Sequence, residues 1–194
     1  MATVDPPPIA GLVHAIDKIA LWSGRIVSFL IIPMVLSLVW EVIARYFFNA
    51  PTVWAYDVTF MTYGTFFMLG SAYTLQRAGH IRTDSFYAGW SPRTQGMVDT
   101  LCYVLFFFPA IVIFLDVTWD FFWVSFQRGE RSVTSPWLPP IWPLKAVLPA
   151  TCVLLLLQGC AELIRSVVAW RTGVWIGRRN LLRRADRLEE KPSV

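Results

Sequence analysis

The sequence predicts an all-α membrane protein with four transmembrane helices and both termini in the cytoplasm. Its 194 residues are 56% hydrophobic and only 15% charged, whereas soluble domains of this size carry about 25% charged residues. Uncharged stretches long enough to cross a hydrocarbon core of roughly 30 Å recur along the chain. Ten tryptophans point the same way, because tryptophan favours membrane–water boundaries. One helical bundle in a membrane follows.

Residues 1–25 are expected to form an N-terminal tail and an amphipathic interfacial helix. Apolar residues recur at helical spacing from Ile9 to Ala20, with His14, Asp17 and Lys18 on the other side. Such a helix fits the membrane surface and could continue into the first span. The apolar core that follows is too long for a secretory signal. We therefore expect the chain to keep its first span as an anchor.

The first two spans are predicted at about 26–48 and 53–76. Pro33 is tolerable inside the first span, because neighbouring helices can satisfy the freed carbonyl. Glu41 and Arg45 are four residues apart near its end, the favourable order for an ion pair on one helix face. The uncharged part of the second span, residues 58–76, covers about 28 Å as a helix.

The third and fourth spans are predicted at about 97–124 and 144–170. Asp116 and Asp120 are one turn apart in the third span. Like charges at this spacing repel, so these residues need a headgroup boundary or cationic partners. The proline-rich loop before the fourth span cannot be helical, and we expect an extended segment whose tryptophans, Trp137 and Trp142, pack on the bundle.

Lysine and arginine counts set the predicted orientation. Of the 17 Lys and Arg residues, 13 lie in the N-terminal segment, the loop at 77–95 and the C-terminal end. The positive-inside rule then places both termini in the cytoplasm. Residues 171–194 form a basic cytoplasmic tail, expected to lie on anionic lipid.

The residues offer little for catalysis. No phosphate loop, serine nucleophile motif or zinc spacing is present, so we expect no catalytic, cofactor-binding or metal residue. The cysteines, Cys102, Cys152 and Cys160, are interpreted as small buried residues. We interpret the middles of all four spans as apolar, which argues against a solute path within this chain.

Four carboxylates map toward the outer boundary, and two interpretations stay open for them. They either pair with Arg45, Lys145 or lipid headgroups, or form a docking surface for another chain. These residues are Glu41, Asp57, Asp116 and Asp120.

Over roughly Ile16 to Val168 the chain resembles the small membrane subunit of tripartite ATP-independent periplasmic (TRAP) transporters. The resemblance is carried by four stretches in order. They are Trp40-Glu41-Val42-Ile43-Ala44-Arg45-Tyr46 followed by Asn49-Ala50-Pro51-Thr52 and Trp54, then Gly64-Thr65-Phe66-Phe67-Met68-Leu69-Gly70-Ser71-Ala72, the turn Gly79-His80-Ile81-Arg82-Thr83-Asp84, and Ser132 with Pro136, Trp142-Pro143 and Pro149.

The resemblance implies a scaffold subunit of the bacterial inner membrane that braces a large membrane subunit. That partner would hold the sodium and substrate sites, and a periplasmic binding protein would deliver an organic acid. Neither an enzyme activity nor a nucleic-acid partner is expected. The residues then available for docking at the periplasmic end are Glu41, Arg45, Asp57, Asp116, Asp120, Arg128, Glu130 and Arg131. The residues that would order the cytoplasmic turn are His80, Arg82 and Asp84.

Two other functions are compatible with four apolar helices. A membrane-anchor subunit of a redox complex would need haem or quinone ligands, and both histidines map to the cytoplasmic surface. A small self-sufficient transporter would carry solute when reconstituted alone.

Overall fold

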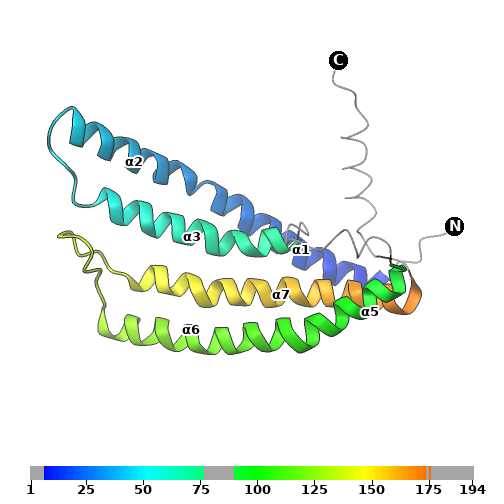
Figure 1. Cartoon of the computed structure of the whole chain (residues 1–194). Helices are drawn as coiled ribbons and strands as arrows, with labels where there is room; N and C mark the ends of the chain where they lie inside the picture. The colour runs from blue at the N-terminus through cyan, green and yellow to red at the C-terminus, as the bar shows by residue number, and fades with distance from the viewer. Residues whose placement is uncertain (1–6, 77–89, 174, 176–194) are drawn as a thin grey trace, which may run out of the picture.

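The computed structural model describes residues 7–76, 90–173 and 175, and within these ranges the chain is almost entirely helical (Figure 1). The prediction of an all-α protein is confirmed. The pairing of Arg131 with Pro140 is an isolated antiparallel bridge inside a loop. The helices are α1 (Pro7–Ser28), α2 (Ile31–Tyr46), α3 (Ala55–Gln76), α5 (Pro92–Cys102), the π-helix η1 (Tyr103–Phe107), α6 (Phe108–Arg128) and α7 (Trp142–Thr172).

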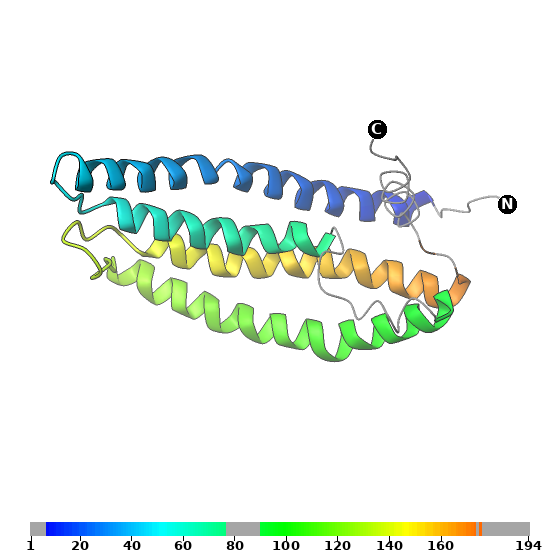
Figure 2. The ribbon, with the colours of Figure 1, turned by 45° about the horizontal axis from the view of Figure 1, so that its top comes forward.

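The helices lie side by side with α7 at the centre of the bundle (Figures 1 and 2). Helix α7 contacts α1, α3, α5 and α6, whereas α2 packs on α3. We call the end that carries residues 47–54 and 129–141 the loop end. At the opposite end, α1 and α5 begin and α7 finishes.

Helices α1 and α2 follow one another along one side of the bundle, separated by a break at residues 29–30 (Figure 2). Pro33 explains the break, because it has no N–H to donate to the carbonyl of Phe29, four residues earlier. The Phe29 oxygen instead accepts from the Ile32 N–H at 3.1 Å. The residues of the predicted amphipathic helix lie in α1, and its apolar side chains Val13 and Ile16 are buried.

Helix α3 packs closely against α1 and α7. A Cβ added at Gly24 of α1 would lie 2.6 Å from the ring of Tyr73 in α3, so the helices approach at a point where only glycine fits. A Cβ at Gly64 would lie 3.2 Å from Leu144 of α7. These contacts place α3 between the N-terminal helices and α7.

Helices α5, η1 and α6 form one continuous, bent run that reaches beyond the predicted third span at both ends (Figure 2). Ser91 caps its start by accepting from the Thr94 N–H at 3.3 Å, and Pro92 occupies the first helical turn. Pro109, the second residue of α6, cannot complete the helical bond to residue 105. The bend in the run and the wider π-helical turn therefore share one cause.

Helix α7 is the best-buried element of the bundle, and small residues allow its neighbours to approach. A Cβ at Gly96 of α5 would lie 2.5 Å from the Trp170 backbone nitrogen. In the same half of the bundle, Val13, Ile16 and Ala161 form a buried apolar cluster between α1 and α7. Gly173, at a φ of 73°, ends the helix in the left-handed conformation.

Within the described residues, three stretches are long and apolar enough to cross a membrane: Gly11–Tyr46, Pro92–Arg128 and Trp142–Thr172. Many large apolar side chains on them are exposed in the isolated chain, such as Leu36 at 63% and Phe106 at 71%. The three thiols do not share one environment. Cys152 is buried as predicted, but the prediction was wrong for Cys102 and Cys160, which are exposed on the outer faces of their helices.

Candidate functional site

At the loop end, Glu41 of α2 joins its own helix to the connection that follows. Its carboxylate accepts from Arg45 Nε at 2.9 Å, which confirms the ion pair expected from their spacing. The other carboxylate oxygen accepts from the Thr52 backbone N–H at 2.9 Å and from the Thr52 hydroxyl. Asn49, at a φ of 50°, makes the reversal between them. Glu41 therefore stabilises the turn after α2 as well as forming an ion pair with Arg45.

Asp57 links the start of α3 to the second loop of this end, residues 129–141. Its side chain is 1% exposed. One carboxylate oxygen accepts from the Thr134 hydroxyl at 2.7 Å and the other from the Ser135 hydroxyl. These donors are 77 and 78 residues away in the chain, so local sequence spacing could not predict the two hydrogen bonds. A buried carboxylate fully occupied in this way fixes one loop against another helix.

Glu130 and Lys145 close the second loop onto α7. The Lys145 ammonium donates to the Glu130 carboxylate at 2.5 Å and lies 3.9 Å from the centre of the Phe121 ring. The Lys145 side chain is 11% exposed, so its charge is held in the bundle. The hydrogen bond from this ammonium holds the pKa of Glu130 below its ordinary value of 4.5.

Backbone contacts order the rest of this loop. The Ile141 N–H donates to the Glu130 carbonyl at 3.0 Å, and Arg131 donates to the Leu138 carbonyl at 3.3 Å. The ring of Trp142 packs edge-on against Phe126 at 5.3 Å, as expected. The expectation of a packed Trp137 was wrong, because this side chain is 47% exposed.

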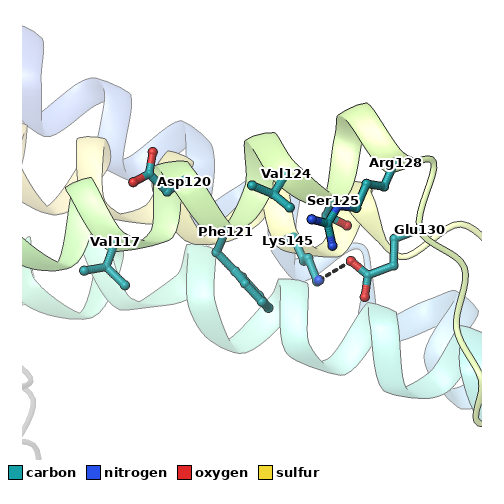
Figure 3. Close-up of a pocket in the computed structure, with 8 residues that line it drawn as sticks. All are labelled: Val117, Asp120, Phe121, Val124, Ser125, Arg128, Glu130 and Lys145. Atoms are coloured by element: carbon teal, nitrogen blue, oxygen red, sulfur yellow. Dashed lines mark hydrogen bonds and ion pairs between the residues drawn. The ribbon is translucent and has the colours of Figure 1, made fainter.

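A pocket of about 680 Å³ lies where this loop meets α6 and α7 (Figure 3). It has an apolar wall from α6 and charged groups toward the loop. Figure 3 shows the Glu130–Lys145 pair on one side and Asp120 farther along α6. The lining residues are Val117, Asp120, Phe121, Val124, Ser125, Arg128, Glu130 and Lys145.

Asp116 and Asp120 are both exposed on α6. Pairing with Arg45 or Lys145 was one expectation for them. Those two cations bind Glu41 and Glu130 instead. Within residues 7–76 and 90–173, the ion pairs of the structure do not include either aspartate. The residues of the predicted cytoplasmic turn, His80, Arg82 and Asp84, lie outside the described residues.

A second polar network lies where α1, α3 and α7 meet. The Arg165 guanidinium pairs with Asp17 of α1 and with Glu162 of its own helix. The Gln158 amide donates to the Asp17 carboxylate at 3.2 Å, and the Gln76 amide donates to the Asp17 backbone carbonyl at 3.1 Å. We call these five residues the ion cluster.

The ion cluster corrects the interpretation of the middle of the fourth span as apolar. Gln158, Glu162 and Arg165 are 1%, 5% and 8% exposed. Their spacing of four and three residues was the available signal, because it places all three on one face of α7. Asp17 was assigned to a solvated face, yet its carboxylate meets that same stripe.

The two networks are suited to binding and bracing. Carboxylates, cations and hydroxyls are paired with one another, and the described part of the chain contains no group of three or more His, Cys, Asp or Glu side chains placed to hold a metal ion. Such arrangements fix helices and loops in place.

Comparison with protein families gives one match. Residues 34–169 match the family model described as "Tripartite ATP-independent periplasmic transporters, DctQ component". A search among curated protein sequences finds no match. The family match covers well over half of the chain, confirms the resemblance and decides against a redox anchor, because the family is not enzymatic. Membership implies a complex with DctM and DctP components. The chain therefore belongs to the DctQ family, the small membrane component of TRAP transporters, and is a multi-pass protein of the bacterial inner membrane.

Proposed function

We propose that this chain is the scaffold subunit of a sodium-coupled importer of an organic acid, and that it has four spans with both termini in the cytoplasm. In this proposal α3 also crosses the membrane, in addition to the three apolar stretches described above. Its 22 residues extend about 33 Å, which is long enough. The large membrane component holds the sodium and substrate sites. This chain braces that component in the bilayer.

One observation carries the scaffold role: polar side chains inside the bundle bind each other across helix contacts. The ion cluster joins α1, α3 and α7, and Asp57 joins α3 to the second loop. A solute path needs polar groups that are free to exchange partners with the solute. Side chains that bind one another across helix contacts favour bracing over conduction.

Reconstitution tests this proposal. Proteoliposomes with the complete transporter, supplied with its binding protein and an imposed sodium gradient, should take up organic acid. Vesicles with this chain alone, or with the large membrane component alone, should not. Uptake by this chain alone would overturn the scaffold role. Uptake by the complete transporter that is indifferent to sodium would overturn the sodium coupling.

We also propose that the loop end faces the periplasm and receives the binding protein. Arg131 is exposed, and its side-chain contact is a long hydrogen bond to a backbone carbonyl. Arg131→Glu should therefore weaken docking of the binding protein while the loop stays folded. Docking measured by surface plasmon resonance on nanodiscs would show this. Lys18→Glu, on the exposed face of α1 at the opposite end, is the matched control, and equal affinity for both variants would contradict the role of Arg131.

A further inference from the structure

We propose that the outward face of α6, centred on Asp116 and Asp120, is the surface that binds the partner membrane component, and that it receives a basic side chain from that component. This inference rests on the proposed function, because it takes the scaffold role as given. It names the face through which the scaffold is attached.

The first support is that two carboxylates on this face have no cationic partner in the part of the chain that the structure describes. Asp116 and Asp120 are exposed, and the ion pairs among the described residues leave them out. Lys145 is held by Glu130. Arg128 lies eight residues after Asp120, about 12 Å along the helix axis. Among the described residues, Asp17, Glu130 and Glu162 have a cationic partner, whereas these two aspartates have none.

The second support is the apolar setting of these carboxylates. Ile113, Val117 and Trp119 beside them are 65%, 59% and 52% exposed, and the helix belongs to a stretch apolar enough to cross a membrane. Asp116 is twelve residues from Arg128, or about 18 Å of helix, so the arginine at the end of its own helix is too far along the axis to pair with it. Lipid tails offer no donor to a carboxylate, so a protein partner is the occupant that satisfies it.

The third support is the recess beside Asp120. The pocket shown in Figure 3 has room for a long side chain, and Ser125 forms part of its lining. Ser125 is 1% exposed, and its hydroxyl has no hydrogen-bond partner among the described residues. Glu130 already neutralises the Lys145 ammonium in the wall. A guanidinium or ammonium entering from the Asp120 side would meet a carboxylate that the ion pairs of the described residues leave unoccupied.

The experiment co-expresses the full chain with its partner membrane component and compares wild type with the double variant D116N/D120N. Asparagine keeps the shape and removes the charges. We expect at least a tenfold loss of co-purified partner. The melting temperature of the chain purified alone should be unchanged or higher, because two unpaired charges are gone. D116E/D120E, which keeps both charges, should retain most of the partner.

D99N is the matched control, because it removes one carboxylate from the same helical run at the opposite end, and it should leave recovery unchanged. Wild-type recovery with D116N/D120N would overturn the inference while the scaffold role stands. A drop in the melting temperature of the variant alone would also overturn it, because the carboxylates would then serve the fold of this chain. Failure of the wild type to co-purify would overturn the inference together with the proposed function.

Discussion

Two sets of membrane carboxylates in this chain have opposite surroundings. In the ion cluster, Asp17 and Glu162 share the Arg165 guanidinium, and the surrounding helices cover all three side chains. On α6, Asp116 and Asp120 are exposed among apolar side chains, and the ion pairs of the described residues do not reach them. The same chemical group is enclosed in one region and open in the other.

The difference indicates what each region does. Polar groups that serve the fold of a single chain find partners within it, because an unpaired buried charge is costly. Groups left open on a membrane helix need partners from outside the chain. The ion cluster therefore stabilises the bundle of this chain, and the α6 face binds the partner component.

The largest effect is expected from Arg165→Met. This change leaves two carboxylates facing each other without their cation, so the free energy of unfolding should fall by about 3–5 kcal/mol. Reversible unfolding in mixed micelles, followed by circular dichroism, measures it. Arg131→Met, which removes an exposed arginine at the loop end, should change stability by less than about 0.5 kcal/mol. Equal losses for both variants would show that the ion cluster does not hold the bundle.

Asp57→Ala should have the next largest effect, because it leaves the hydroxyls of Thr134 and Ser135 without their acceptor. Hydrogen bonds to a charged group contribute about 1.5–3 kcal/mol. We expect a loss in that range, together with faster amide hydrogen exchange in residues 132–140. A variant with wild-type exchange in this loop would contradict the linking role of Asp57.

Gly96→Ala probes the packing of α5 on α7. The added Cβ would lie 2.5 Å from the Trp170 nitrogen and 2.6 Å from the Ser166 carbonyl oxygen, both rigid backbone atoms. The free-energy cost of this overpacking should exceed the gain from the higher helix propensity of alanine. We expect a net destabilisation of about 1–2 kcal/mol. Gly70→Ala in α3 has nothing within 4 Å of the new Cβ, so its thermal unfolding should occur at the same temperature or a higher one. The reverse order of the two variants would contradict the close contact.

The smallest effect concerns pH at the loop end. Lys145 lowers the pKa of Glu130 in the folded state. The pair therefore stabilises the fold above the ordinary pKa of the carboxyl and loses this contribution as pH falls through the folded-state value. The stability difference between wild type and Glu130→Gln should shrink as pH falls below the ordinary carboxyl pKa of 4.5. The Glu130 side chain is 45% exposed, so the difference is small throughout. A gap in melting temperature that does not change with pH would contradict this linkage.

Sequence alone predicted what depends on local spacing. The helical class followed from apolar runs, and the Glu41–Arg45 pair followed from their separation by one turn. Contacts between segments far apart in the sequence could not be predicted, as with Asp57 and the two hydroxyls of the second loop. Describing the fourth span by its average hydrophobicity overlooked Glu162 and Arg165. Their spacing places them on one polar face of the helix.

Other differences come from tertiary packing. Cys102 and Cys160 are of a residue type common in protein cores, yet both are exposed among the described helices. Asp17 looked solvated because its neighbours His14 and Lys18 are. Its position opposite Arg165 depends on how α1 crosses α7, which the pattern within α1 does not contain.

The central claim is that the open face of α6 is an assembly surface, and photo-crosslinking from Val117 tests it most directly. Val117 lies between the two aspartates and is 59% exposed. With a photoreactive amino acid at this position in the assembled transporter, we expect an adduct with the partner membrane component. An adduct with lipid alone would contradict the account.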